Sequence, residues 1–166
     1  MLNAKFWEMV NVCSGFVTVD MQAAANNGDW VNLANYAKLV IVLFKAAGTA
    51  GDDPTLTIKQ ATDASGTSAK ALNFTKAAIK QGTLTAVADY TAISQAAGNT
   101  YTNDTLAESQ AIFIVDIDNK DLDVANGFKF VQASVADVGG NAQIGCCLYF
   151  LIDARYAGAS LPSGIA

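Results

Sequence analysis

The run Leu39-Val40-Ile41-Val42-Leu43-Phe44 decides the fold class of this chain. Every position in it is apolar, and Lys38 and Lys45 stand at its two ends. A short run of branched residues that is apolar on both alternating faces is typical of a strand at the centre of a sheet, covered on both sides. It is far shorter than the roughly 20 residues that a membrane-spanning helix needs. The run therefore predicts a central, buried β-strand.

The segments around this run alternate between apolar and polar residues, as strands with one buried face do. In the segment 55–60, Leu56 and Ile58 share one parity, and two threonines and Lys59 share the other. Further strands are predicted over residues 15–20, 30–33, 70–76, 84–93, 111–118, 128–135 and 143–156, with polar, Gly-containing loops at 48–54, 62–68 and 96–104. About eight strands with turns between them predict an all-β fold, a jelly-roll-like β-sandwich.

The length of 166 residues suits one domain. We expect the sandwich to span residues 15–156, with an N-terminal arm over residues 1–14 and a flexible C-terminal tail over residues 157–166. The arm contains Lys5 and Glu8 and no long apolar stretch, so it does not resemble a signal peptide. It is expected to be a short helix or an extended segment.

Composition excludes several classes of function. The chain contains no histidine, which is the commonest general base and metal ligand in proteins. Motifs for a serine or cysteine nucleophile and for a phosphate-binding loop are absent as well. The net charge is −5 and the ten Lys and Arg are scattered, whereas nucleic acids and anionic membranes attract concentrated positive charge. We therefore expect no enzyme activity, no cofactor, no nucleic-acid partner and no membrane partner.

The best candidate for a ligand site is an acidic cluster, formed by Asp116, Asp118, Asp121 and Asp123. Hard cations such as calcium prefer several oxygen ligands. An EF-hand loop starting at Asp116 fails, because its fifth, sixth and twelfth positions hold Lys120, Asp121 and Gly127. A calcium site of another kind stays open. The favoured interpretation is a solvated turn whose aspartates accept backbone N–H groups, so no metal site is predicted.

The three cysteines, Cys13, Cys146 and Cys147, do not resemble a disulfide framework. Neighbours on a strand point to opposite faces, so Cys146 and Cys147 are poorly placed to bridge each other. We predict that these two are reduced and buried, one toward the core and the other toward an adjacent surface or subunit. A disulfide between Cys13 and one of them stays open.

Apolar content and aromatic residues point to contacts between subunits. The chain is 52% apolar and 15% charged, which indicates apolar surface beyond what one small domain buries. We expect a homo-oligomer with Phe6, Trp7 and Trp30 as contact residues, because the arm has no obvious place in the sandwich. Packing of both tryptophans in the core is the alternative. A carbohydrate-binding platform is a further alternative, made of Trp7, Trp30, Tyr36, Tyr101 and Tyr156.

Two parts of the chain carry a resemblance to a known class of protein. The first is Gly28-Asp29-Trp30-Val31-Asn32-Leu33-Ala34-Asn35-Tyr36-Ala37-Lys38-Leu39, with Leu56-Thr57-Ile58-Lys59-Gln60-Ala61-Thr62-Asp63 and Lys70-Ala71-Leu72 after the apolar strand. The second is Leu122-Asp123-Val124-Ala125-Asn126-Gly127-Phe128, with a final Tyr149-Phe150-Leu151-Ile152-Asp153-Ala154-Arg155-Tyr156. Together they resemble virion structural proteins of tailed bacteriophages and prophages, of the type that decorates or cements the capsid. The resemblance covers about residues 15–156.

This resemblance implies a jelly-roll or β-sandwich subunit that sits in the virion as a symmetric oligomer, with a trimer as the first expectation. It implies the major capsid protein as a partner and assembly in the host bacterial cytoplasm. It carries no catalytic or binding residue over, because its motifs are structural. A neck or tail subunit of the same particle stays open as an alternative.

Overall fold

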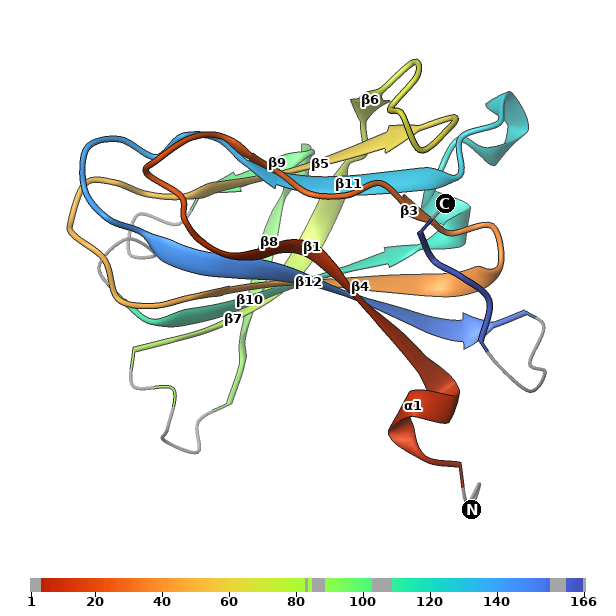
Figure 1. The fold of residues 1–166 in the computed structure, drawn as a ribbon, viewed down its shortest axis with the longest axis horizontal. Coiled ribbons are helices and arrows are strands. Elements are labelled where there is room, and N and C mark those ends of the chain that lie inside the picture. Colours follow the sequence, from red (N-terminus) through yellow and green to blue (C-terminus); the bar gives the residue numbers. More distant parts are fainter. Residues whose placement is uncertain (1–3, 83, 85–88, 103–108, 156–160, 166) are drawn as a thin grey trace.

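The structure is a computed structural model, and it describes residues 4–82, 84, 89–102, 109–155 and 161–165. Two antiparallel sheets face each other and enclose the core (Figure 1). The first sheet has the strand order β1-β12-β4-β10-β7-β8. The second has the order β2-β11-β5-β6, with β3 also paired to β11 and β9 to β5. The predicted all-β sandwich is confirmed.

The first sheet contains the longer strands: β1 (Val10–Asp20), β4 (Tyr36–Lys45), β7 (Phe74–Gln81), β8 (Thr91–Gly98), β10 (Ala111–Asp118) and β12 (Ile144–Ala154). The second contains β2 (Asn26–Asn27), β3 (Val31–Asn32), β5 (Thr55–Ala61), β6 (Lys70–Ala71), β9 (Thr100–Thr102) and β11 (Phe130–Val135). A turn of helix, α1 (Phe6–Met9), precedes β1, and two 3₁₀ turns follow β10, η1 (Asn119–Asp121) and η2 (Val124–Asn126). No helix in the described ranges is long and apolar enough to cross a membrane.

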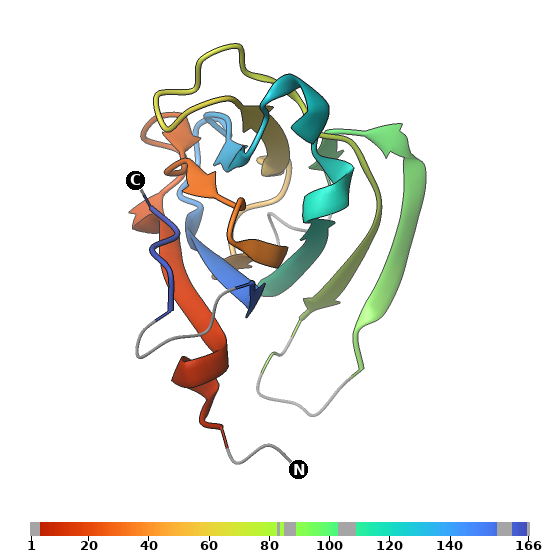
Figure 2. The same cartoon turned by 90° about the vertical axis from the view of Figure 1, so that its right-hand side faces the viewer.

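The pairing of strands is nested along the chain, which is the wrapping of a jelly roll. β1 pairs with β12, β2 and β3 pair with β11, β4 pairs with β10, and β5 pairs with β9. The chain therefore follows one long antiparallel hairpin rolled around the core, and it alternates between the two sheets. β7 and β8 add a further hairpin at the edge of the first sheet (Figure 2).

The core lies between the sheets and is built by one parity of each central strand. In β4, Leu39, Ile41 and Leu43 are buried, and β10 and β12 flank this strand on either side. The register sets Ile41 between Val115 and Tyr149, so three buried side chains meet in one row. The second sheet closes the core with Leu56, Ile58, Val131, Ala133 and Val135. The central position predicted for the apolar run is confirmed.

One part of that prediction is wrong, because the apolar run is not covered on both sides. Val40, Val42 and Phe44 point to the solvent side of the first sheet, where the described chain has no second layer (Figure 1). Val40 and Val42 are half-buried, and Phe44 is exposed. Apolar residues on both faces of a strand predict that both faces are covered, and the described part of the chain covers only the face toward the second sheet.

The C-terminal segment, residues 161–165, is bound to the sandwich. The Pro162 carbonyl accepts a hydrogen bond from the Asn11 side chain of β1 at 3.0 Å. The Gly164 carbonyl accepts the backbone N–H of Asn32 in β3 at 2.7 Å. This segment was expected within a flexible tail, and instead it ties an edge of the first sheet to the second.

Some element boundaries differ from the sequence-based expectation. β1 begins at Val10, so the sheet takes in residues 10–14 of the expected arm. β8 and β9 occupy much of the expected loop at 96–104. The segment 70–76 is divided between β6 and β7, because its two ends belong to different sheets. Parts of the predicted strand at 84–93, and residues 157–160 of the expected tail, lie outside the described residues.

Candidate subunit interface

The solvent side of the first sheet carries a continuous apolar surface, which we call the outer face. It arises because side chains alternate along a strand and neighbouring strands keep register. Its cross-strand rows are Val12, Phe150 and Val40, which ends at Asp116 of β10; then Leu148, Val42 and Ile114, which begins at Ser14 of β1; then Cys146, Phe44 and Ile112. β1, β12, β4 and β10 therefore present branched and aromatic side chains to solvent together.

The two ends of the outer face are the most exposed. At one end, Phe44 and Ile144 are 45% and 49% exposed, and Val17, in the irregular part of β1 on the other side of β12 from Phe44, is 73% exposed. We call these three residues the Phe44 cluster. At the other end lies α1, whose Phe6 and Trp7 are 54% and 67% exposed. Monomeric proteins rarely leave a contiguous apolar surface of this extent uncovered, so the outer face is a candidate interface.

The helical turn α1 is held by its own sequence and by one aromatic contact with the outer face. The backbone N–H of Lys5 donates to the Glu8 carboxylate at 2.7 Å, and the N–H of Glu8 donates to the Lys5 carbonyl at 2.9 Å. The Lys5 ammonium lies 5.0 Å from the centre of the Trp7 ring. Phe6 packs edge-on against Phe150, with ring centroids 6.4 Å apart. α1 thus stands beside the outer face (Figure 2), and both of its aromatic side chains are more than half exposed.

The structure separates Trp30 from the other two residues expected at a contact. Trp30 directly precedes β3 in the second sheet and is partly buried. Its ring packs over the backbone of Gly66, where a Cβ would lie 2.8 Å from the indole nitrogen. Phe6 and Trp7, by contrast, share one element beside the outer face. Of the three predicted contact residues, the structure brings only Phe6 and Trp7 together.

Sequence reasoning missed several residues of the outer face. These are Ile112 and Ile114 in β10, and Leu148, Phe150 and Ile152 in β12. The signal was present, because both strands are apolar on both parities over much of their length, as β4 is. In a sandwich of two layers each strand buries one parity against the other sheet. The apolar residues on the second face of these strands therefore marked a surface that the other sheet leaves uncovered.

The solvent side of the second sheet has the opposite character. It carries hydroxyl, amide and ammonium groups, from Thr55, Thr57, Lys59, Thr100, Thr102 and Gln132. The hydroxyls of Thr55 and Thr102 are hydrogen-bonded to each other across β5 and β9. One side of the sandwich thus suits water, and the other suits a protein partner.

The aspartates of the acidic cluster are engaged by lysines and by backbone groups. Lys38 lies 3.3 Å from Asp116 and 3.7 Å from Asp118, and Lys120 lies 3.2 Å from Asp118. The backbone N–H of Asp118 donates to the Asp121 carboxylate at 3.0 Å. The hydrogen bond and charge of Lys120 lower the pKa of Asp118. This is the hydrogen-bonded turn that the sequence favours.

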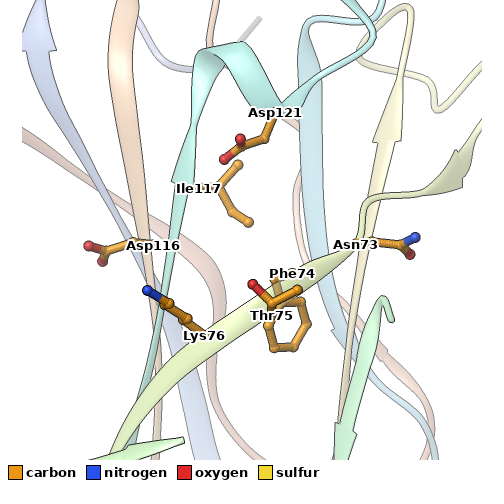
Figure 3. Close-up of a pocket in the computed structure, with 7 residues that line it drawn as sticks. All are labelled: Asn73, Phe74, Thr75, Lys76, Asp116, Ile117 and Asp121. Carbon is orange, nitrogen blue, oxygen red and sulfur yellow. The ribbon is translucent and has the colours of Figure 1, made fainter. Parts of the chain in front are cut away.

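The remaining geometry of the cluster is also that of a turn. Asp123 pairs with Lys70 at 2.5 Å, and the hydrogen bond from Lys70 lowers the pKa of this carboxyl. A hollow of about 180 Å³ opens between β7 and β10 where their pairing ends, and Figure 3 shows Asp116 and Asp121 apart on it, with Ile117 between them. Among the described residues, no three acidic or cysteine side chains converge as metal ligands do.

The two neighbouring cysteines point to opposite sides of β12. Cys147 is fully buried in the core, and burial raises the pKa of its thiol to about 12. Cys146 lies on the outer face and is half-buried. The predicted opposite orientation is confirmed, whereas the prediction that both thiols are buried is wrong for Cys146. Cys13 is also a free thiol, so the disulfide left open by the sequence is not formed.

The aromatic residues considered for a sugar platform do not share a surface. Tyr36 is fully buried. Tyr101 stacks on Phe113 of the core, with ring centroids 4.7 Å apart and the planes at 8°. The two tryptophans lie on separate elements, as described above. Tyr156 lies outside the described residues. The described aromatic residues therefore do not support carbohydrate binding.

Comparisons with known proteins add a similarity of fold only. No family model and no curated protein matches the chain. Among solved structures, the chain is similar to the SPBc2 prophage-derived protein YomS, with a TM-score of 0.44 and 12% sequence identity. The match covers 84% of this chain and 92% of the YomS chain. At this identity and TM-score the similarity carries no information on function, and the chemistry of the molecular surface is the better guide.

Proposed function

We propose that this chain is a non-enzymatic structural subunit that assembles with copies of itself through the outer face and decorates or cements the capsid lattice of a tailed bacteriophage. One observation carries the proposal: a single chain leaves an apolar surface over four neighbouring strands open to solvent. Interfaces of obligate oligomers resemble a domain core cut in half, and the outer face has that composition.

The contrast between the two sides of the sandwich supports a fixed orientation in the assembly. Charged groups of the outer face lie at its margin, where Lys38 pairs with Asp116 and Asp118, and the centre is apolar. The second sheet presents threonine, glutamine and lysine to solvent. In the assembled protein, the outer face contacts protein and the second sheet faces water.

The role on a capsid is supported by the sequence resemblance to virion decoration proteins. On that basis, the partner is the major capsid protein, the assembly is a trimer, and the protein resides in the virion after assembly in the host bacterial cytoplasm. Three of the four aspartates of the acidic cluster are paired with lysines and Asp121 accepts the backbone N–H of Asp118, which agrees with a structural role for them. We propose no catalytic residue and no metal.

Light scattering coupled to gel filtration tests the assembly. The wild-type protein is expected at three times the 17.3 kDa mass of one chain. Leu148→Lys places a charge at the centre of the outer face and is expected to shift the protein to a monomer, because an interface cannot bury an unpaired ammonium. The control Gln132→Lys adds the same charge to the second sheet and is expected to leave the mass unchanged. A wild-type mass of 17.3 kDa at high micromolar concentration overturns self-assembly.

Electron microscopy of particles tests the location. Purified phage capsids that lack this protein are mixed with the wild-type chain or with Leu148→Lys. The wild-type chain is expected to add density at many equivalent positions of the capsid lattice, and the variant is expected to add little. Density at the neck or tail alone overturns capsid decoration and leaves self-assembly standing.

A further inference from the structure

We infer that α1 of one copy covers the Phe44 cluster of a second copy. The inference rests on the proposed self-assembly and names the contact that stabilises it. Both sets of side chains are exposed and apolar, and they lie at opposite ends of the same outer face. The occupant we assign to each Phe44 cluster is therefore a segment of this same chain.

The α1 turn cannot cover the Phe44 cluster of its own chain. β1 leaves α1 at Val10, which pairs with Ile152 near the end of β12, whereas Ile144 lies at its beginning. The separation of eight residues between these positions spans about 25 Å of extended strand, and a four-residue helical turn is only about 6 Å long. The α1 turn that covers a Phe44 cluster is therefore that of another copy in the proposed assembly.

Within the described residues, the α1 turn has little cover from its own chain. None of its four residues is buried, and Trp7 and Met9 are exposed. A single helical turn is not stable alone in water and needs packing on an apolar surface. Within its own chain, the described aromatic contact of α1 is that of Phe6 with Phe150. A second copy of the outer face supplies the packing that α1 needs.

The exposed areas of the two sets match. Fully exposed aromatic side chains present about 150–250 Å², so the exposed parts of Phe6, Trp7 and Met9 amount to roughly 350 Å² and those of the Phe44 cluster to roughly 300 Å². When each copy covers both sets, and the rows between them come into contact, the area approaches the roughly 800 Å² per partner of a stable interface. The contact is thus large enough to hold subunits together.

The contact also closes under simple rotation. In a cyclic trimer the contact runs head to tail: the α1 of each subunit reaches the Phe44 cluster of the next subunit, and the third α1 returns to the first subunit, so that no α1 and no Phe44 cluster is left over. α1 stands off the first sheet on its outer side, where a second copy would meet it (Figures 1 and 2).

Photo-crosslinking tests the contact directly. Photoreactive benzoylphenylalanine replaces Trp7 in an equal mixture of ¹⁴N- and ¹⁵N-labelled chains, and mass spectrometry then identifies the linked peptides. Peptides of mixed isotope composition that join position 7 to segments around positions 17, 44 or 144 are expected. The control places the same label at Val124, an exposed residue of η2 outside the outer face, and is expected to give none of these links.

A charge exchange gives an independent measure. Trp7→Glu and Phe44→Lys are each expected to weaken association at least tenfold, because each sets a charge against an apolar partner. The double variant Trp7→Glu/Phe44→Lys is expected to regain part of the loss, since the two charges then meet across subunits. Val124→Glu is the matched control and is expected to associate like the wild type.

The outcomes separate this contact from self-assembly itself. An oligomer whose position 7 links to other surfaces, to its own chain or, with capsids present, to the capsid protein alone overturns the α1 contact and leaves self-assembly standing. The absence of rescue in the double variant also overturns it. A wild-type chain that stays monomeric overturns both proposals.

Discussion

At the scale of single residues, Tyr149 joins the two sheets through its hydroxyl group. Its ring is buried on β12, and its oxygen accepts the N–H of Ala133 in β11 at 2.8 Å. The close approach of the Tyr149 hydroxyl to the backbone around residue 28 requires a glycine there, because a Cβ on Gly28 would lie 2.6 Å from the hydroxyl oxygen. Burial raises the pKa of the phenol, so the hydroxyl stays protonated in the folded protein.

Tyr149→Phe is expected to lower the free energy of unfolding by about 1–3 kcal/mol, because it leaves the N–H of Ala133 buried without a partner. Urea unfolding followed by circular dichroism measures the loss. Tyr90→Phe removes an exposed hydroxyl and is the control, with an expected change within about 0.5 kcal/mol. Equal losses in the two variants would contradict a special role for Tyr149.

Lys45 is a buried cation at the end of β4. Its ammonium donates to the carbonyl of Ala46 at 2.7 Å and to the carbonyl of Ser109 at 3.0 Å. Burial lowers its pKa to about 8, and the charge of Asp53 opposes part of the shift. The lowered pKa links the stability of the fold to pH, because the unfolded chain releases this proton only near 10.5.

Between pH 8 and 10.5 the unfolded chain therefore binds more protons at Lys45, and this residue makes the fold more stable as pH rises. That gain is complete above 10.5 and is lost as pH falls through 8. The Tm of the wild type is expected to rise relative to that of Lys45→Met over this range, measured by calorimetry. The raised pKa values of Cys147 and Tyr149 make the fold less stable as pH rises. The wild type and Lys45→Met share this effect, so it cancels in the difference between their Tm values. A constant Tm difference would contradict the assignment.

At the scale of elements, the C-terminal segment closes one edge of the sandwich. Its Pro162 carbonyl accepts hydrogen bonds from the side chains of Asn11 and Tyr36, and the Tyr36 ring is fully buried. Gly164 lies directly against Leu151 of β12, so close that a Cβ would displace the leucine side chain. The segment thus covers polar groups that would otherwise be left at the junction of the two sheets.

Removal of residues 161–166 is expected to lower the Tm and to accelerate hydrogen exchange at the Asn32 amide, which loses its acceptor at Gly164. Each buried polar group left without a partner costs about 1–3 kcal/mol. Exchange followed by mass spectrometry measures the local effect. Ser163→Ala removes only the local hydrogen bond from an exposed hydroxyl to the Ile165 carbonyl, keeps the contacts of the segment with β1 and β3, and serves as the control. Unchanged exchange at Asn32 would show that the segment is not bound in solution.

Strands are predictable from sequence where the signal is local. The segments 55–60 and 111–118 match β5 and β10, because alternation of apolar residues is visible within each strand. β8 contains mainly alanine, glycine and small polar residues, so its pairing with β7 defines it and its own pattern does not. The nested pairing joins the two ends of the chain, and no local pattern encodes such distant partners.

The candidate interface was predictable only in part. Phe6 and Trp7 were expected at a contact because the sandwich pattern left them without a partner, and both are exposed. Whether they contact a second copy stays a prediction. Trp30 packs on the loop around Gly66, a contact between segments far apart in sequence. Apolar residues at alternate positions of a strand predict that this face of the strand is buried. They do not show whether the same chain or another one covers it.

At the scale of the whole molecule, stability and assembly are linked by mass action. In the proposed assembly folded subunits bind each other and unfolded chains do not, so the Tm of the wild type is expected to rise with protein concentration. Scanning fluorimetry over a hundredfold range of concentration measures the effect. Leu148→Lys is expected to have the same Tm at every concentration. A wild-type Tm that does not move would contradict assembly through the outer face.

The path of the C-terminal segment determines which end of this protein suits the attachment of a fused cargo. The segment runs beside β3, so the described chain ends at Ile165 next to the second sheet, away from the outer face (Figure 1). In the proposed assembly, a payload fused after Ala166 would start on the water-exposed side of every copy. A payload fused before Met1 would start near α1 and compete with the neighbouring subunit. Cargo display on a particle surface therefore favours the C-terminal end.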